Sequence, residues 1–258
     1  MLTKLREAVS SAAPKKEFNT RVQRLERLSP HLLRVVLTGQ ALDDFPSGFE
    51  GGYVKLALQR SDGSPCKRSY TVRGFSPQAR ELVLDMVVHD HRGPAADWIA
   101  AAVQDGELML SGPGRCAPIN VEADAFLLAG DLSALPAICV NLARLPADAI
   151  GQAVLEVPGE SDMIDVLAPA GVHIQWLFNP ITNPQPDLLE RTVRALPWPE
   201  GQVAVWIAGE FDAARGLRRY LRTERAVPKS HSYISCYWKR GVSDEGMKAA
   251  KRNDRDMW

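Results

Sequence analysis

The hydrophobic pattern changes character about halfway along the chain. In the first half, short segments of alternating or β-branched apolar residues at 18–27, 31–38, 53–59, 68–73, 81–88 and 108–110 are separated by connections rich in Gly and Pro. Short segments at this spacing predict an antiparallel barrel or sandwich. Ahead of them, Leu2, Leu5 and Val9 stand at helical spacing, which predicts a short helix over 2–13.

From about residue 122 the apolar segments become continuous and alternate with helical ones. The uninterrupted run 125–130 is typical of a parallel strand buried on both faces. Further strands are expected at 153–157, 173–178, 203–208 and 232–238, with helices at about 131–145, 187–196 and 210–225 and a polar, helix-compatible tail at 247–258. Alternation of this kind predicts a three-layer α/β domain. We therefore expect an α+β protein of two domains, an antiparallel barrel at 1–121 and an α/β domain at 122–258.

Composition and charge narrow the classes of partner. The chain has 258 residues, 45% hydrophobic and 24% charged, which is ordinary for a globular protein. Lys plus Arg and Asp plus Glu number 31 each, and this balance argues against nucleic acid as the main partner. No apolar run approaches the roughly 20 residues that span a bilayer, and the charged N-terminus lacks the apolar core of a signal peptide. We expect a cytoplasmic monomer without membrane insertion.

Metal and thiol chemistry find little support in the sequence. Two histidines, His89 and His91, stand two residues apart, but no third ligand is placed near them. The cysteines form no Cys-x-x-Cys pair, which argues against zinc, an iron–sulfur cluster or a thiol redox couple; they are Cys66, Cys116, Cys139 and Cys236. We expect them to be small, buried side chains in a reducing compartment.

The first candidate for chemistry is the segment 67–73, KRSYTVR. As a strand, it sends Arg68 and Tyr70 to one face and Ser69 and Thr71 to the other. A guanidinium can fork onto a pyrophosphate, a phenol ring can lie against an isoalloxazine, and a hydroxyl can bond its polar edge. The segment therefore suits a flavin, although a barrel strand with solvated Arg residues has the same pattern.

The second candidate is the segment 89–100, HDHRGPAADWIA, which follows a predicted strand. Gly93-Pro94 predicts the start of a helix, and small Ala95 and Ala96 allow close approach to its first amides. Such a helix N-terminus can receive a pyrophosphate. An ordinary capped helix inserted in a barrel remains the alternative.

The α/β half lacks the Gly-x-Gly-x-x-Gly fingerprint of dinucleotide binding. The other nucleotide site of such a sheet is the crevice at the carboxyl ends of its strands. Gly130-Asp131 and Gly209-Glu210 are expected there. We find no acid–base pair or Ser/His/Asp arrangement that indicates hydrolysis.

Six short motifs occur in a characteristic order. They are 68–73 (RSYTVR), His89 with 93–95 (GPA) and Trp98, 130–138 (GDLSALPAI), 206–210 (WIAGE), 217–221 (LRRYL), and 237–239 (YWK) with Gly241. This series resembles the siderophore-interacting protein family, FAD-dependent ferric-siderophore reductases with a ferredoxin-reductase-like fold. The resemblance covers about 16–246.

The resemblance implies a role for each matching residue. Arg68 would hold the FAD phosphate, Tyr70 its ring, and Thr71 its reactive edge. Other implied cofactor contacts are Ser69, His89, Gly93, Ala95, Ala96, Trp98, Asp131 and Ser133. The implied region for the nicotinamide nucleotide comprises Gly209, Glu210 and Arg218.

The implied substrate is a ferric siderophore. Hard oxygen donors hold Fe(III), and reduction to Fe(II) weakens those bonds because the ion is softer and less charged. A flavin can accept two electrons as hydride and pass them on singly. Basic side chains would hold an often anionic chelate near the flavin, and the candidates are Lys55, Lys239 and Arg240. The alternative is that all three are ordinary solvated surface charges.

The sequence also departs from the family pattern. Leu132 and Ser133 replace Glu and Thr, Cys236 replaces Gly, and 176–179 (WLFN) replaces a pattern that commonly carries His and Arg. The last change removes a phosphate-binding charge, so NADH, NADPH and reduced ferredoxin all stay open as electron donors. Two other activities stay open: a general flavin-dependent electron-transfer reductase and a non-enzymatic ferric-chelate binder. We expect the C-terminal tail to fold back over the flavin or the interdomain cleft.

Overall fold

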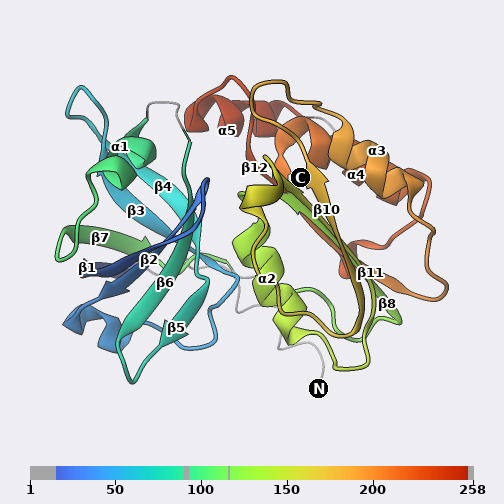
Figure 1. Ribbon diagram of the computed structural model, residues 1–258, viewed down its shortest axis with the longest axis horizontal. Helices are drawn as coiled ribbons and strands as arrows, with labels where there is room; N and C mark the ends of the chain where they lie inside the picture. Colours follow the sequence, from blue (N-terminus) through green and yellow to red (C-terminus); the bar gives the residue numbers. More distant parts are fainter. Residues whose placement is uncertain (1–15, 90–92, 116, 255–258) are drawn as a thin grey trace, which may run out of the picture.

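The computed structural model describes residues 16–89, 93–115 and 117–254. The predicted helix at 2–13, His91 and Cys116 lie outside these residues. The described chain forms one antiparallel sheet followed by one parallel sheet, set side by side (Figure 1). This confirms the expected α+β two-domain fold, while the domain boundary at 121/122 stays a prediction.

The first sheet has seven antiparallel strands in the order β4-β3-β7-β1-β2-β6-β5. The strands are β1 (Lys16–Ser29), β2 (Leu32–Thr38), β3 (Tyr53–Gln59), β4 (Pro65–Thr71), β5 (Gly74–Ser76), β6 (Glu81–Val87) and β7 (Glu107–Gly112). A 3-10 helix, η1 (Gln40–Asp44), follows β2, and α1 (Pro94–Ala101) precedes β7. Alternate residues such as Val54, Leu56 and Leu58 of β3 are buried in one core, as period-two alternation predicts.

The sheet curls where β4 ends. The Val72 amide donates to the Gly52 carbonyl (2.9 Å), whereas the next amide, that of Arg73, donates to the Val83 carbonyl of β6 (2.8 Å). The chain therefore leaves one edge of the sheet and joins the other within two residues. The prediction of a single strand over 68–73 was wrong at its end for this reason, since β4 stops at Thr71.

The second sheet has five parallel strands in the order β10-β9-β8-β11-β12. They are β8 (Ala125–Asp131), β9 (Ile150–Val157), β10 (Gly171–Phe178), β11 (Val203–Glu210) and β12 (Ser232–Trp238). Every residue of β8 is buried, as its unbroken apolar sequence predicts. Two short 3-10 helices lie in the connections, η2 (Glu160–Asp162) and η3 (Lys229–His231).

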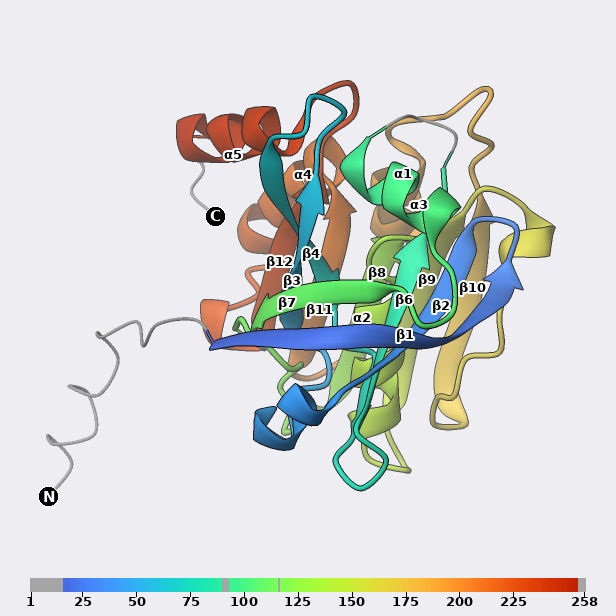
Figure 2. The ribbon, with the colours of Figure 1, turned by 90° about the vertical axis from the view of Figure 1, so that its left-hand side faces the viewer.

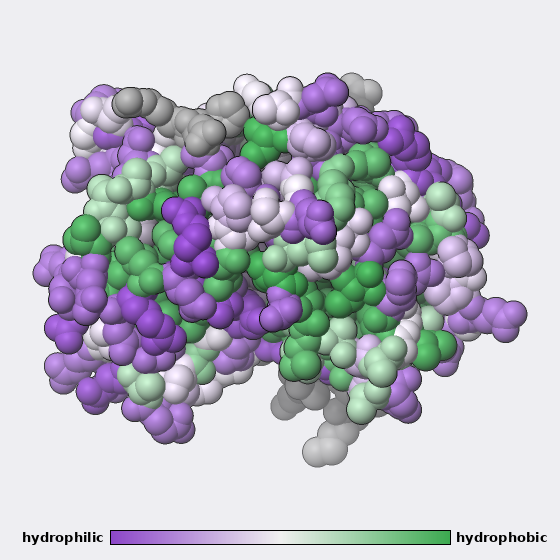
Figure 3. All heavy atoms as spheres, in the orientation of Figure 1, coloured by the Kyte–Doolittle hydropathy of each residue, from purple (hydrophilic) through white to green (hydrophobic). Residues whose placement is uncertain are grey.

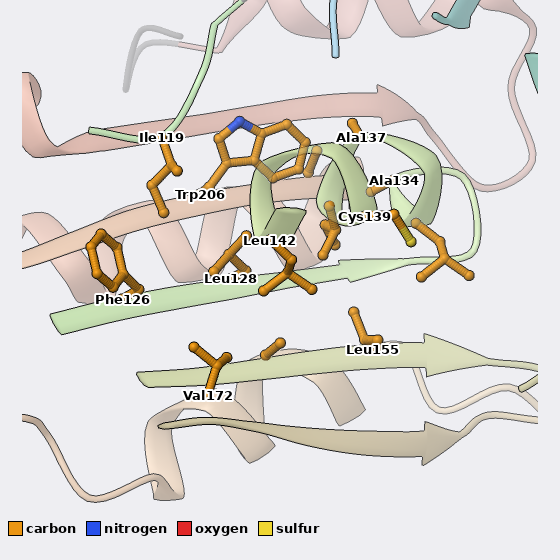
Figure 4. Close-up of a cluster of buried hydrophobic side chains, with 14 of the residues drawn as sticks. Ile119, Phe126, Leu128, Ala134, Ala137, Cys139, Leu142, Leu155, Val172 and Trp206 are labelled. Carbon is orange, nitrogen blue, oxygen red and sulfur yellow. The ribbon is translucent and has the colours of Figure 1, made fainter. Parts of the chain in front are cut away.

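Helices cover both faces of the parallel sheet. On one face α2 (Leu135–Arg144) packs Ile138 and Leu142 against Leu128 and Trp206 (Figure 4). On the other face, α3 (Leu188–Ala195) and α4 (Phe211–Thr223) complete a separate core. The predicted three-layer arrangement is thereby confirmed. In Figure 3, hydrophobic residues gather near the middle of the face that α2 occupies, and hydrophilic residues are more common toward its periphery.

The two halves are joined through α2 and through η2. Arg144 of α2 pairs with Glu50 of the barrel half at 3.6 Å. The Ser29 hydroxyl donates to Asp162 Oδ1 of η2 (2.8 Å), and His31 Nδ1 lies 2.8 Å from the other oxygen of the same carboxylate. Asp162 is almost completely buried, so this contact is part of the packed interface.

A last helix, α5 (Asp244–Asn253), crosses from one half to the other (Figures 1 and 2). Met247 packs with Phe211 of α4 and Cys236 of β12. On the barrel side, Glu245 pairs with Arg60 of the β3–β4 loop at 2.7 Å. The C-terminal tail therefore contacts both halves. No described helix is long and apolar enough to cross a membrane.

Candidate functional site

The edge strand β4 carries the predicted flavin motif. In its pairing with β3, Arg68 lies opposite Leu56 and Tyr70 opposite Val54, so both side chains start from the core-facing side of the sheet. This confirms that Arg68 and Tyr70 share a face. Burial raises the pKa of Tyr70 to about 12, because the phenolate would lose its water. Tyr70 is therefore a neutral ring and hydrogen-bond donor at ordinary pH.

The other face of β4 carries Ser69 and Thr71. Ser69 lies opposite Lys55, and Thr71 lies opposite Tyr53. Ser69 is exposed and Thr71 is buried. Lys55 therefore shares a face with the two hydroxyls and not with the Tyr70 ring, so a ligand at this edge meets the ring and the lysine from different sides.

Arg68 has a carboxylate for a neighbour. Its Nη1 donates to the Lys67 carbonyl (3.0 Å) and lies 3.8 Å from Asp244 Oδ2 of α5. The Arg68 side chain is one-fifth exposed. The guanidinium therefore lies near an anionic group of the protein, and an ion pair of this length leaves it able to bind a phosphate.

The N-terminus of α1 is open. Gly93 is the N-cap, offers no side-chain cap and is followed by Pro94 at the first helical position. A Cβ added at Gly93 would meet nothing within 4 Å. Within the described part of the chain, the backbone amides of Ala95 and Ala96 therefore lie at a helix end without a capping side chain from its N-cap residue, where the helix dipole favours an anion. His89 is exposed, and Trp98 packs partly against the barrel core.

These residues fit a flavin dinucleotide in their chemistry. Arg68 and an uncapped helix N-terminus are donors for phosphate, and Tyr70 supplies a neutral aromatic surface. The Thr71 hydroxyl starts from the opposite face of the same strand end. The structure thus places the predicted FAD residues of the barrel half on β4, on α1 and just before α1.

The carboxyl edge of the parallel sheet is arranged differently, because its acids bond to the protein itself. Asp131 is 8% exposed. Its Oδ1 accepts from the Ser133 amide (2.9 Å) and hydroxyl (2.5 Å), and its Oδ2 accepts from the Glu210 amide (2.8 Å) and Trp238 Nε1 (2.7 Å). Burial raises the pKa of Asp131, and these hydrogen bonds oppose the rise. The predicted FAD contacts Asp131 and Ser133 are thus bonded to each other.

The predicted nicotinamide residues are also engaged internally. The Glu210 side chain caps α4, accepting from the amides of Asp212 (2.6 Å) and Ala213 (3.3 Å). Arg218 is 1% exposed and pairs with Asp254 at 2.6 Å. A nucleotide phosphate would have to displace a carboxylate at each of these two places. Gly209 is the penultimate residue of β11 and directly precedes Glu210.

The predicted chelate-binding cations follow β12. Lys239 Nζ pairs with Asp212 (2.7 Å) and lies 4.4 Å from the centre of the Phe211 ring. The Arg240 guanidinium lies 5.7 Å from the centre of the Trp238 ring, and its backbone amide donates to Glu210 Oε1 (3.0 Å). The structure thus brings Lys239 and Arg240 together at the carboxyl edge and places Lys55 on the barrel.

Glu156 is a residue that sequence reasoning missed. It is the penultimate residue of β9 and lies beside Asp131 in the β8–β9 register. Burial first, with the nearby Asp131 charge adding to it, raises the pKa of Glu156 to about 7. Its position at a strand carboxyl end was a usable signal, but its burial was not visible in the sequence. Asp244 and Asp212 were missed as well, because their partners Arg68 and Lys239 are remote in sequence.

Two family models match the chain, one in each half. The siderophore-interacting FAD-binding domain matches 21–66 and 59–117, and the siderophore-interacting protein model matches 123–241. Together they cover most of the sequence.

The chain belongs to the siderophore-interacting protein family.

Members of this family resemble it along nearly their whole length. An uncharacterized protein of Mycobacterium tuberculosis, Rv2895c, is 37% identical over 260 residues, covering 87% of this chain and 91% of its own. Ferric vibriobactin reductase ViuB of Vibrio cholerae is 35% identical over 242 residues, covering 86% and 89%. The match to a named reductase supports an oxidoreductase.

Solved structures of the family share the fold. The siderophore-interacting protein SipS from Aeromonas hydrophila superposes with a TM-score of 0.80 at 30% identity, covering 94% of this chain and 99% of SipS. A siderophore utilization protein from T. fusca gives a TM-score of 0.81 at 32% identity, covering 90% and 96%. The ferredoxin reductase of carbazole 1,9a-dioxygenase, at 15% identity and a TM-score of 0.67, shows that the fold is ferredoxin-reductase-like.

Proposed function

We propose that this protein is a cytoplasmic, monomeric FAD-dependent ferric-siderophore reductase, which reduces chelated Fe(III) to Fe(II) with electrons from NADH, NADPH or reduced ferredoxin. The observation that carries the proposal is the pairing of two sites in one chain. The barrel half offers phosphate donors at the N-terminus of α1 and a neutral tyrosine ring on β4, and the α/β half carries Lys239 and Arg240 at its carboxyl edge.

The barrel residues would hold the cofactor. Arg68 and the Ala95 and Ala96 amides would bind the FAD phosphates, Tyr70 would contact the ring system, and Thr71 would hydrogen-bond to its polar edge. When bound, FAD would supply the ability to accept the two electrons of a hydride together and to release them one at a time. The chain's own contribution is to bind and orient the flavin and to keep Tyr70 uncharged against it.

The basic residues would hold the substrate. Lys55, Lys239 and Arg240 attract an anionic ferric chelate and orient it by charge-assisted hydrogen bonds. Lys239 exchanges its contact with Asp212 for one with the chelate. Fe(II) then leaves more readily than Fe(III) because its bonds to hard oxygen donors are weaker.

The first test is anaerobic stopped-flow spectroscopy of the FAD-loaded protein. NADH, NADPH and reduced ferredoxin are compared as reductants of the flavin, and the reduced protein is then mixed with a ferric tris-catecholate, a ferric trihydroxamate or ferric citrate. We expect at least one donor to bleach the flavin and one chelate to restore its colour while an Fe(II) indicator develops. A protein that retains no flavin would contradict the proposal and favour a non-enzymatic chelate binder.

The second test separates chelate reduction from general electron transfer. Lys55→Ala and Lys239→Ala should each lower turnover with the ferric chelate by about tenfold, with little loss for ferricyanide. Lys229→Ala is the matched control, since Lys229 is an exposed lysine at the opposite end of β12. Equal turnover of all three variants with the chelate would favour a general flavin-dependent reductase.

A further inference from the structure

Three carboxylates from neighbouring elements hold the last residue of β12 and the two residues after it, 238–240. Trp238 Nε1 donates to Asp131 of β8 (2.7 Å), and the Arg240 amide donates to Glu210 of β11 (3.0 Å). Lys239 Nζ pairs with Asp212, at the start of α4 (2.7 Å). Each of the three consecutive residues therefore has its own acidic partner. Two of these carboxylates bind an indole N–H and a backbone amide, and the third binds a lysine ammonium group.

Asp131 has no free acceptor directed at a ligand. Each of its oxygens accepts two hydrogen bonds from the protein, and the residue is 8% exposed. The backbone beside it is shaped around the carboxylate. A Cβ at Gly209 would lie 2.7 Å from Asp131 Oδ2, and the φ of Gly209 is +150°. Burying a carboxylate costs free energy, and the four donors offset that cost.

The end of β12 is bent toward Asp131 by a register shift. β11 pairs Gly209 with Cys236 but Glu210 with Trp238, so Tyr237 is an extra residue on β12. A bulge of this kind re-aims the side chain that follows it. The edge of the Trp238 indole thereby reaches Asp131, while the residue stays 38% exposed and the Arg240 guanidinium lies beside its ring.

We propose that Asp131 and Glu210 are positioning residues for the anionic ferric chelate: they fix Trp238 and Arg240 at the crevice and contact neither the flavin nor the chelate. This rests on the proposed function, and it departs from the role as an FAD contact that the family resemblance implies for Asp131. Asp131 acts through the indole, and Glu210 acts through the Arg240 backbone while it caps α4.

The first part of the experiment needs no substrate. FAD-loaded protein is labelled with ¹⁵N at its indole nitrogens, and Trp238→Phe identifies the Trp238 resonance. In Asp131→Asn, which loses acceptor capacity, this resonance should shift and its N–H should exchange with solvent at least about tenfold faster, while the other indoles stay unchanged. An unmoved Trp238 resonance would overturn the proposal.

The second part measures affinity, with ferric tris-catecholate as the probe. Asp131→Asn and Trp238→Phe should each weaken its binding by about fivefold, and the double variant should be no weaker than Trp238→Phe alone, because the two residues act as one unit. FAD affinity and the flavin absorption spectrum should not change. Asp124→Asn is the matched control, because Asp124 accepts from the Gln202 amide (2.7 Å) at the opposite edge of the same sheet.

The remaining outcomes separate this proposal from the proposed function. Additive losses in the double variant, or a weakened FAD complex in Asp131→Asn, would show that Asp131 touches the ligands directly and would overturn it. If the wild type binds the probe and Asp131→Asn binds it equally well, only the positioning role fails. If the wild type does not bind the probe at all, the proposed function fails for this chelate and the role of Asp131 toward it fails too, whatever the indole resonance shows.

Discussion

The barrel edge and the carboxyl edge of the parallel sheet carry equally conspicuous motifs, yet their polar groups are used in different ways. At the barrel edge, the N-cap Gly93 of α1 supplies no side-chain cap, and Arg68 has one hydrogen bond to a backbone carbonyl and a long ion pair. At the carboxyl edge, the carboxylate oxygens of Asp131 and Glu210 accept hydrogen bonds from backbone amides, a serine hydroxyl and an indole. The difference teaches that the polar groups of one motif can stay available to a ligand while those of another motif stabilise the fold itself.

The largest effect is expected from Arg68→Ala. If the barrel edge is the ligand-binding region, loss of the guanidinium should weaken FAD binding by roughly 30-fold or more, since charge-assisted bonds to phosphate are strong. Titration of the apoprotein with FAD, followed by flavin fluorescence, measures this. Arg60→Ala is the control, because Arg60 also pairs with an acid of α5 but lies in the β3–β4 loop. Full flavin occupancy of Arg68→Ala would count against this placement of the phosphates.

Gly209→Ala tests the bracing at the other edge. The new Cβ would lie 2.7 Å from Asp131 Oδ2 at a φ that L residues rarely adopt. We expect the free energy of unfolding to fall by about 2 kcal/mol. Thermal and urea unfolding measure it. Gly159→Ala should be nearly neutral, since a Cβ there meets nothing within 4 Å. Equal stability of the two variants would mean that the backbone is not built tightly around Asp131.

Glu156 gives the carboxyl edge a pH dependence. Its folded pKa of about 7 lies above its ordinary value of 4.5. Between these values the folded state keeps a proton that the unfolded state has released, so this group makes stability fall as pH rises from 4.5 to 7.

Glu156→Gln should remove that slope, because the amide mimics the protonated acid. We expect its melting temperature to match the wild type near pH 4.5 and to exceed it by a few degrees at pH 8. Melting curves across this range, with exposed Glu122→Gln as the control, provide the measurement. A variant with the wild-type slope would show that Glu156 is ionised in the folded protein.

The smallest effect is expected from Asp244→Asn. It removes the carboxylate 3.8 Å from Arg68, which competes with phosphate for the same guanidinium. Since both side chains are partly exposed, FAD binding should tighten by only about two- to threefold, and the gain should shrink at high salt. Asp187→Asn, at the start of α3, is the control. Weaker FAD binding in Asp244→Asn would instead make α5 part of the cofactor site.

The sequence predicted what depends on local patterns. The alternation at 53–59 and the aromatic run at 232–238 gave the bounds of β3 and β12 to the residue. The short strand β5 was missed, because Gly74, Phe75 and Ser76 read as a turn and become a strand only by pairing with β6. Tertiary pairing overrode the local signal there.

In the candidate site too, features that depend on local sequence were predicted, and features that depend on remote residues were not. The shared face of Arg68 and Tyr70 follows from strand period alone, and it was predicted. The partners of Asp131 could not be, because the Glu210 amide and the Trp238 indole are 79 and 107 residues away. The bulge at Tyr237 that aims the indole depends on the β11–β12 register, which no local pattern encodes.

The helix α5 has a practical consequence for work on this protein. Met247 of this helix packs in the α/β half and Glu245 pairs with the barrel half, so α5 links the two domains. Deleting α5 would remove this link and leave the contacts that α2 and η2 make with the barrel half, so a truncated protein should show a weaker interface between the halves.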